Sequence, residues 1–538
     1  MGMKPNSLAL RTSWHFVINL ALVYVAYYIC RFAYIFENWE ALKSVLTENS
    51  LSDFVVGCWK FDTSAILYTN SLYALMMLLP VHLKEKRGWQ RAAKGVYLVV
   101  NGLCLAINLC DAVYFKYTGR RTTCSVFDEF ANENNLGTVF GTEVVNHWYF
   151  VLLWAVMMVA LWKLYRPCLC SKRWVQPLMP VGKRGFINYY ITQLLCLLLF
   201  LPLCIWGMRG GIGSFVRPIT ISNANQYVNR PAEAAAILNT PFSLLRSMSR
   251  KSFVDPKYFD QTTLDSLYSP VHNVAPDSAR VVNKRNVVVM ILESFGREYL
   301  GAYNEKLEGG NYKGYTTFLD SLYEHCASFD YTFGNGRKSI DGMPSVLSSI
   351  PMFVEPFVLT SSSLCQVGGI ASETGKMGYS SAFFHGAPNG SMGFLGYSRT
   401  TGFGQYFGLD EYCEDSRFGG SSDYDGTWGI WDEPFLQYYA LHMGNLKEPF
   451  TSSVFTLSSH HPFAVPAKYA NVYREEGNNP IHKCVRYTDN ALRQFFATAQ
   501  QQPWFENTIF VLVNDHCNQI DHDEYRTDLG MFGSTILF

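Results

Sequence analysis

Five long apolar runs in the first 210 residues constrain this chain more than any other feature of its sequence. Each run is about 17–23 residues long, the length that an α-helix needs to cross a hydrocarbon layer about 30 Å thick. The first run lacks a short apolar stretch with a small-residue cleavage site, so we interpret it as a retained helix. We therefore predict five transmembrane helices, at residues 14–36, 63–83, 95–115, 148–164 and 187–208.

Basic residues are concentrated in the loops that this arrangement places on one side of the membrane. The loop between the second and third runs is basic, and so is the junction of the fourth and fifth runs. The positive-inside rule then places the N-terminus and both basic loops in the cytoplasm. Five crossings would carry everything after Met208 to the extracytoplasmic side. The formal net charge is zero, which removes any general case for nucleic-acid binding.

A few polar residues interrupt the apolar runs, namely Asn70, Asn101, Asn108 and Asp111. Polar side chains inside a membrane segment sometimes line a transport path. Hydrogen bonds between helices, or positions near the membrane interface, are the favoured interpretation here. A transporter is not favoured, since the residues with recognisable chemistry lie outside the apolar runs.

The composition changes twice beyond the predicted membrane domain of residues 1–208. Residues 209–284 mix turn residues with one short helix-forming stretch, and we interpret them as a connector along the membrane surface. In residues 285–538, short apolar runs alternate with helical segments. Near-continuous apolar strands separated by helices predict an α/β domain with a mostly parallel sheet covered by helices.

Four of these predicted strands end in residues that can do chemistry. The ends are Glu293-Ser294, His385-Gly386, Ser458-Ser459-His460-His461 and Asp515-His516. Ligands of such sheets collect at the carboxyl ends of the strands. Four ends of this kind are hard to explain by packing alone.

Three of these residues form a candidate metal site. Glu293, Asp515 and His516 offer two carboxylates and an imidazole, a donor set that suits Zn²⁺ or Mn²⁺. A cap or turn residue is the alternative interpretation of each residue taken alone.

The stretch "FGNGRKSIDGMPSVLSSIP" contains a candidate nucleophile. Ser339 follows two glycines and precedes a predicted helix, so it lies where a helix N-terminus favours negative charge. Beside a metal its hydroxyl can become a nucleophile toward a phosphoryl group, whereas alone it is a plain N-cap serine. Arg337 and Lys338 either neutralise an anionic substrate or are solvated.

Two histidines and a tryptophan-rich segment complete the candidate site. His385 and His460 suit hydrogen bonding to phosphate oxygens or protonation of a leaving alkoxide, and a structural role is equally plausible for each alone. The stretch "WGIWDEP", from Trp428 to Pro434, is either a pocket wall or a buried anchor.

The motifs "ILESFG", "NGRKSIDGMPSVLSSIP", "FHG", "TLSSHHPF" and "NDH" occur in an order that resembles one family. The chain is similar over nearly its whole length to the lipoteichoic acid synthases and the related Gram-negative sulfatase-like proteins of the alkaline phosphatase superfamily. More distantly, it resembles the phosphoethanolamine transferases. The resemblance implies a multi-pass protein of the bacterial inner membrane with a periplasmic or extracytoplasmic catalytic domain.

The resemblance also implies roles for single residues. Glu293, Asp515 and His516 would bind Mn²⁺ or Zn²⁺, and Ser339 would be both nucleophile and fourth metal ligand, where many members have threonine. His385 and His460 would contact the phosphate of the substrate. The family chemistry is a two-step transfer, in which a phospholipid donor loses diacylglycerol and its headgroup phosphate passes through the enzyme to an acceptor hydroxyl.

Three departures from the family pattern limit this comparison. The tryptophan and arginine that cradle glycerol phosphate in lipoteichoic acid synthases correspond here to Met392 and Phe394, which puts that headgroup in doubt. After Ser339 the chain reads "IDGMP", without the motif that sulfatases need to make formylglycine, so sulfate-ester hydrolysis is not expected. The chain stops at "GSTILF", soon after the last ligands, so we expect a C-terminally truncated domain.

The leading hypothesis is a membrane-anchored, metal-dependent phosphotransferase. It would move a phospholipid headgroup phosphate, of the glycerol phosphate or phosphoethanolamine type, to an envelope glycan or lipid through a covalent intermediate on Ser339. A metal-dependent phosphodiesterase with water as acceptor is one alternative. A catalytically silent envelope protein that binds anionic polymers is another.

Overall fold

The chain forms two hydrophobic cores, one among its N-terminal helices and one around a β-sheet. The computed structural model describes residues 5–81, 84, 86–129, 136–167, 182–211, 218–248, 257–269, 283–473 and 479–538. These residues divide into two units. The first unit contains residues 1–250, 359–366 and 390–400, and the second contains residues 251–358, 367–389 and 401–538.

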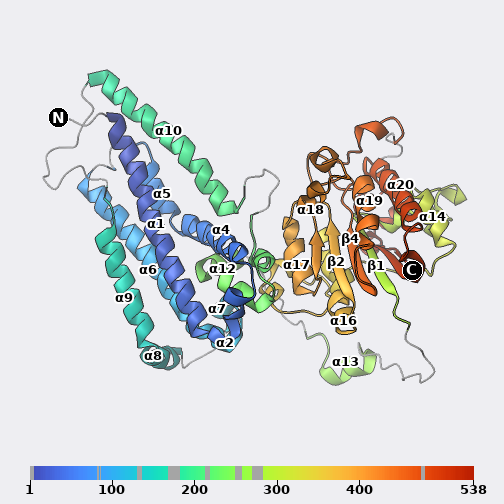
Figure 1. Ribbon diagram of the computed structural model, residues 1–538, viewed down its shortest axis with the longest axis horizontal. Helices are drawn as coiled ribbons and strands as arrows, with labels where there is room; N and C mark the ends of the chain where they lie inside the picture. Colours follow the sequence, from blue (N-terminus) through green and yellow to red (C-terminus); the bar gives the residue numbers. More distant parts are fainter. Residues whose placement is uncertain are drawn as a thin grey trace. The chain divides into compact units, whose positions relative to one another are not determined.

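Among the described residues, three helices of the first unit are long and apolar enough to cross a membrane. They are Thr12–Glu37 within α1 (Pro5–Glu37), α6 (Arg87–Thr118) and Ile187–Arg209 within α10 (Gly182–Arg209) (Figure 1). A shorter apolar helix, α9 (Trp148–Leu164), has the predicted bounds. Three of the five predicted spans thus have both the length and the hydropathy of a membrane crossing among the described residues, and the number of crossings stays a prediction.

The apolar run at residues 63–83 differs most from its prediction, because it is not one helix. It is divided between α4 (Leu51–Thr69) and α5 (Ser71–Leu78), with Asn70 between them (Figure 1). Asn70 donates a side-chain hydrogen bond to the Ile66 carbonyl at 3.0 Å, and α5 stops before Pro80, which disfavours helical geometry in the residue preceding it. Side-chain hydrogen bonding and proline thus override the apolar pattern.

Shorter helices complete the first unit. They are α2 (Trp39–Leu42), α3 (Ser44–Thr47), α7 (Ser125–Glu129), α8 (Leu136–Asn146), the 3₁₀-helix η2 (Ile221–Tyr227), α11 (Ala234–Ile237), α12 (Thr240–Ser247) and α17 (Phe394–Thr400). The polar residues within the apolar runs bond to neighbouring elements, as the favoured interpretation predicts. Asn70 and Asn101, for example, exchange two side-chain hydrogen bonds at 3.0 and 2.8 Å.

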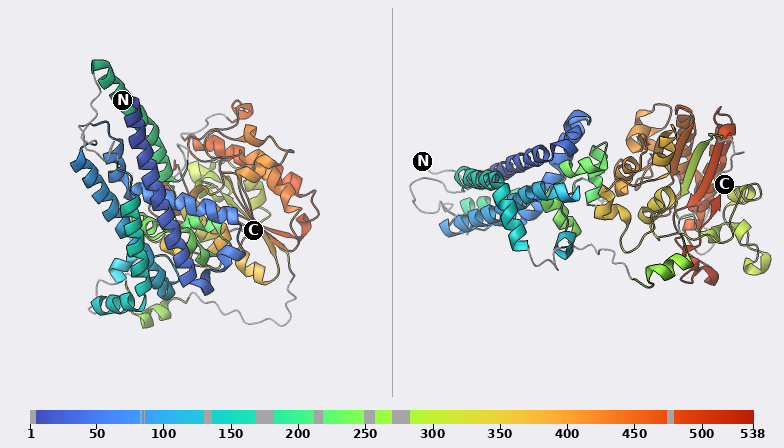
Figure 2. Two further views of the ribbon diagram at one scale, coloured as in Figure 1. Left: turned by 60° about the vertical axis from the view of Figure 1, so that its left-hand side comes forward. Right: turned by 90° about the horizontal axis from the view of Figure 1, so that it is seen from below.

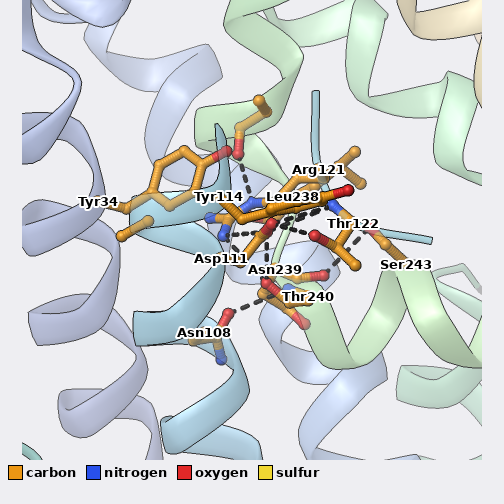
Figure 3. Close-up of polar contacts among 12 residues, drawn as sticks. Tyr34, Asn108, Asp111, Tyr114, Arg121, Thr122, Leu238, Asn239, Thr240 and Ser243 are labelled. Atoms are coloured by element: carbon orange, nitrogen blue, oxygen red, sulfur yellow. Dashed lines mark hydrogen bonds and ion pairs between the residues drawn. The ribbon is translucent and has the colours of Figure 1, made fainter. Parts of the chain in front are cut away.

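Residues 218–248, part of the predicted connector, pack into the core of the first unit. Arg121 donates to the carbonyls of Ala235 and Leu238 at 2.8 and 2.9 Å, and it pairs with Asp111 at 3.2 Å (Figure 3). The Asp111 carboxylate also accepts the Thr240 hydroxyl at 2.8 Å. A buried ion pair therefore ties this segment to α6. Its position at a membrane surface stays a prediction.

Loss of this ion pair is expected to destabilise the first unit. Arg121 and Asp111 are each 2% exposed, so Asp111→Ala would leave a buried guanidinium without its carboxylate. Breaking such a pair typically costs about 3–5 kcal/mol. Thermal unfolding of the purified chain in detergent should show a large drop in melting temperature for Asp111→Ala. Glu40→Gln, which breaks an exposed pair with Lys43, should shift it little, and equal shifts for the two variants would contradict this account.

The second unit is built on a sheet whose central strands, β1, β2 and β4, are buried almost throughout. The described residues form a six-stranded sheet in the order β3-β2-β4-β1-β5-β6. Its strands are β1 (Asn286–Leu292), β2 (Ser380–His385), β3 (Gln405–Phe407), β4 (Phe450–Phe455), β5 (Thr508–Asn514) and β6 (Ile536–Leu537). All neighbouring pairs are parallel except β5 with β6. The predicted mostly parallel sheet is confirmed.

Helices cover both faces of this sheet (Figure 2). Val288, Met290 and Leu292 of β1 belong to one core cluster with α19 (Asp432–Met443) and α20 (Ile481–Ala499). The remaining helices of the unit are α13 (Gln261–Leu267), α14 (Thr317–Tyr323), α15 (Ser339–Ser348), α16 (Ile370–Lys376) and α18 (Leu409–Glu414). The Thr451 hydroxyl of β4 donates to Thr374 of α16 at 2.7 Å. Parallel strands covered in this way end at one common edge, where a site can form.

Candidate active site

The register of the sheet brings the predicted metal ligands together. Leu292 pairs with Asn514 in the parallel β1–β5 ladder, so Glu293 and Asp515 leave the sheet side by side. His516 follows directly. One donor atom from each of these three residues lies within 4.8 Å of the others, and the side chains are 2%, 2% and 8% exposed. The sequence-predicted trio is thus one buried cluster.

The charges of the cluster favour a cation. Burial opposes ionisation of Glu293 and acts to raise its pKa. The hydrogen bond and charge of His516 outweigh the effect of burial and lower the pKa of Glu293 to about 2. Burial and the negative charge of Glu293 raise the pKa of Asp515 to about 7. The two carboxylates raise the pKa of His516 to about 10, although burial acts in the opposite direction. A divalent cation would relieve the repulsion between the carboxylates.

The individual donor atoms also suit a metal. His516 Nδ1 lies 2.7 Å from the Cys517 carbonyl, which can only accept, so Nδ1 keeps its proton and Nε2 would bind a metal after losing its own proton. Asp515 Oδ2 is buried and faces His516 Nε2 at 3.2 Å, so one ion could contact both atoms. Two carboxylates and one imidazole at this spacing fit Zn²⁺ or Mn²⁺, as the sequence predicts.

Ser339 is the first residue of α15, and its hydroxyl reaches the cluster. Oγ donates to Glu293 Oε2 at 2.7 Å and lies 3.5 Å from His516 Nε2. A Cβ at Gly336 would come within 2.2 Å of the Asp341 side chain, so the loop that leads to Ser339 needs glycine there. A serine hydroxyl at a helix N-terminus, next to three metal-type ligands, has the surroundings of an activated nucleophile.

Ser294, which follows Glu293 directly, supports the cluster. Its hydroxyl donates to Glu293 Oε1 at 2.7 Å, and its backbone N–H donates to Asp515 Oδ1 at 2.8 Å. Its φ of 59° is in the left-handed region, which a non-glycine residue rarely adopts. Ser294 therefore orients two candidate ligands, a role that no sequence signal predicted.

His385 is the last residue of β2 and is 2% exposed. Its Nδ1 lies 3.0 Å from the Phe455 carbonyl, which can only accept, so Nδ1 carries the proton. Burial lowers the pKa of His385 to about 4. The imidazole is therefore neutral at pH 7, with its proton on Nδ1.

We expect His385 to remain uncharged well below its ordinary pKa of 6.5. In ¹⁵N-histidine spectra of the substrate-free protein, its signals should show the Nδ1-protonated form and a midpoint near pH 4, with His385→Gln assigning them. Because the folded-state pKa is depressed, the contribution of His385 to stability is fully present above pH 6.5 and is lost as the pH falls toward 4. A midpoint near pH 6.5 would contradict this environment.

The other predicted substrate residues are more accessible. His460 is partly exposed, its Nδ1 lies 3.1 Å from the His461 carbonyl, and its positive charge would contribute to the low pKa of Glu293. Arg337 is exposed in the loop before Ser339. In the first unit, Phe394 is fully buried and Met392 has a φ of 49°. Neither of these two side chains can reproduce a tryptophan–arginine cradle.

The Trp428–Pro434 stretch contains a buried anchor, and its first tryptophan lies against His460. The Trp428 ring lies 4.1 Å from the His460 ring, between centroids, and its indole N–H donates to the His461 carbonyl. Asp432 is buried, and its carboxylate accepts the backbone N–H groups of Leu457 and Ser458. The sequence left the interpretations of a pocket wall and a buried anchor open, because nothing local shows which strand end the segment contacts.

Comparison with known proteins agrees with this fold. Residues 285–532 match the family model "Sulfatase". "Lipoteichoic acid synthase-like YvgJ" of Bacillus subtilis is 24% identical over 460 residues, covering 84% of this chain and 69% of that protein. "Lipoteichoic acid synthase 1" of the same organism is 27% identical over 292 residues, covering 52% of this chain and 43% of that protein.

Among solved structures, the lipoteichoic acid synthase LtaP of Listeria monocytogenes has 17% sequence identity and a TM-score of 0.38. That match covers 47% of this chain and 65% of the other. The chain spans about two thirds of one curated relative and less than half of the other. Residues 285–532 therefore form a sulfatase-like α/β domain, in a chain that is similar to the lipoteichoic acid synthases.

Proposed function

We propose that this chain is a membrane-anchored, metal-dependent phosphotransferase. It moves a phospholipid headgroup phosphate, of the glycerol phosphate or phosphoethanolamine type, to an envelope glycan or lipid. The observation that carries the proposal is the position of the Ser339 hydroxyl, 2.7 Å from Glu293 within the buried Glu293–Asp515–His516 cluster. The similarity to lipoteichoic acid synthases supports the same class of reaction.

The cluster prepares Ser339 for attack. Glu293, Asp515, His516 and the Ser339 hydroxyl would hold Mn²⁺ or Zn²⁺, which as a Lewis acid lowers the pKa of a bound hydroxyl. Glu293 Oε2 accepts the hydrogen bond that Ser339 Oγ donates. This hydrogen bond fixes the direction in which the lone pairs of Ser339 Oγ point. The N-terminus of α15 favours negative charge at the same oxygen.

The transfer then takes two displacements at phosphorus. Ser339 Oγ loses its proton and forms a bond to the phosphorus of the donor, the bond from phosphorus to the diacylglycerol oxygen breaks, and that oxygen takes up a proton. The acceptor hydroxyl next loses its proton and forms a bond to the same phosphorus, which releases Ser339. His460 and Arg337, both accessible, would bind the phosphate oxygens, and the buried His385 would border them.

A phospholipid donor would explain why this enzyme is anchored in the membrane. We propose that the N-terminus is cytoplasmic and that the sulfatase-like domain is extracytoplasmic, in a bacterial inner membrane, because the basic loops at residues 84–94 and 163–184 favour the cytoplasmic side. A donor that is itself part of the membrane is then already concentrated beside the enzyme.

Headgroup transfer from labelled phospholipids tests the proposal. The full chain in detergent or liposomes, with Mn²⁺ or Zn²⁺, should release diacylglycerol from a fluorescent phosphatidylglycerol or phosphatidylethanolamine and add the headgroup to a glycan or lipid acceptor. Diacylglycerol release with water as the acceptor would make the chain a phosphodiesterase. No release from either lipid, with polymer binding intact, would favour a catalytically silent protein.

A further inference from the structure

The segment from Trp428 to Asp432, here called the clasp, contacts the ends of two strands that carry candidate phosphate ligands. It leads into α19, of which Asp432 is the first residue, and it lies outside the candidate metal cluster. His385 ends β2, and His460 lies five residues beyond the end of β4. Asp432, Ile430 and Trp428 make the hydrogen bonds of the clasp to these segments.

Asp432 anchors the clasp to the segment that leads to His460. Its carboxylate accepts the N–H groups of Leu457 at 2.9 Å and Ser458 at 3.1 Å, and also the Thr488 hydroxyl at 2.7 Å. The Asp432 N–H in turn donates to Ser458 Oγ at 2.9 Å. At 2% exposure, these bonds are shielded from water. The hydrogen bonds of Asp432 therefore fix the backbone of the segment that precedes His460.

Gly429 and Ile430 hold the other strand end. The Ile430 N–H donates to the carbonyl of Gly386 at 3.0 Å, one residue after His385. A Cβ at Gly429 would lie 2.4 Å from the same carbonyl oxygen, so only glycine permits this approach. The clasp thus fixes the ends of β2 and β4 relative to each other.

Trp428 acts on the His460 imidazole itself. Its ring lies against the imidazole, with centroids 4.1 Å apart, and its N–H donates to the His461 carbonyl, the group that His460 Nδ1 also faces. This arrangement limits rotation of the imidazole and leaves Nε2 as the nitrogen for a ligand.

We propose that the clasp sets the spacing of His385 and His460 around a phosphoryl group, and that Trp428 is the positioning residue for His460. This inference rests on the proposed function in treating the bound group as a phosphoryl group. Trp428 acts through His460, so its contribution to binding should disappear when the His460 imidazole is absent. A residue with an independent structural role would keep its contribution.

A double-mutant cycle with inorganic phosphate as the probe tests this dependence. Calorimetry on the Mn²⁺-loaded full chain should show phosphate binding weakened about tenfold by Trp428→Ala and at least as much by His460→Ala, as expected when a hydrogen bond to a charged group is lost. The double variant should bind phosphate no more weakly than His460→Ala. Trp428→Phe keeps the ring but not the N–H, and should fall between wild type and Trp428→Ala.

Two further measurements distinguish the possible outcomes. Mn²⁺ content and melting temperature should be the same in wild type and Trp428→Ala, because the metal cluster lies outside the clasp. Additive losses in the double variant, unchanged phosphate affinity in Trp428→Ala, or no phosphate binding by wild type would each overturn the inference. If the cycle is non-additive but no diacylglycerol is released from phospholipid, the proposed phosphotransferase function is wrong, and the inference that Trp428 positions His460 still holds.

Discussion

Replacing Ser339 with alanine is expected to abolish headgroup transfer. The variant loses the oxygen that forms the bond to phosphorus and keeps the metal trio, since Glu293, Asp515 and His516 come from other strand ends. Loss of a nucleophile in covalent catalysis typically lowers kcat by about 10⁴–10⁶-fold. The measurement is the rate of diacylglycerol release from labelled phospholipid by the full chain.

A matched control is Ser339→Thr, which keeps a hydroxyl at the start of α15. It should retain measurable turnover, whereas Ser339→Ala should be inactive even at metal concentrations that saturate the remaining three ligands. Equal turnover by wild type and Ser339→Ala would show that another group carries the phosphoryl transfer, or that water attacks directly.

The second large effect is expected from Asp515→Asn on metal binding. The substitution preserves the Oδ1 acceptor used by the N–H groups of Ser294 and His516, and it replaces the buried Oδ2, which lies 3.2 Å from His516 Nε2, with an uncharged NH₂ group. A change of an outer-shell partner alone usually costs 10–100-fold in metal affinity, so loss of a direct ligand should cost at least about 100-fold. Titration of the metal-free full chain with Mn²⁺ or Zn²⁺ measures this affinity.

Asp523→Asn provides the control for that titration. Asp523 lies eight residues after Asp515, its side chain is 92% exposed, and it pairs with Arg526. Its neutralisation changes the net charge by the same amount and should leave the metal affinity unchanged. If both variants bound metal as tightly as wild type, the cluster would not be the metal site.

The metal trio was predictable from sequence because two features coincide. Val287 to Leu292 form an apolar strand that is too short to span a membrane, and the "NDH" motif ends a second such strand. Parallel strands end at one edge, so Glu293 and Asp515 had to lie near each other once their strands paired. The position of Ser339 followed from its glycine-rich loop and its place before a helix.

Other features depend on contacts that no local pattern contains. The division of residues 63–83 at Asn70 involves a hydrogen-bonded partner, Asn101, on another helix. The burial of residues 234–240 depends on Arg121, more than a hundred residues earlier in the chain. The role of Asp432 depends on backbone N–H groups at Leu457 and Ser458. Hydropathy and spacing describe single segments, and these contacts join segments far apart in sequence.

The most direct test of the account is the mass of a covalent adduct on Ser339. The full chain, mixed with Mn²⁺ and phospholipid and quenched in acid, would be digested and analysed by mass spectrometry. The account predicts a headgroup phosphate on the peptide that contains Ser339, whose mass distinguishes glycerol phosphate from phosphoethanolamine, and no adduct in Ser339→Ala. Diacylglycerol release without any adduct on Ser339, or with an adduct on a different residue, would contradict it.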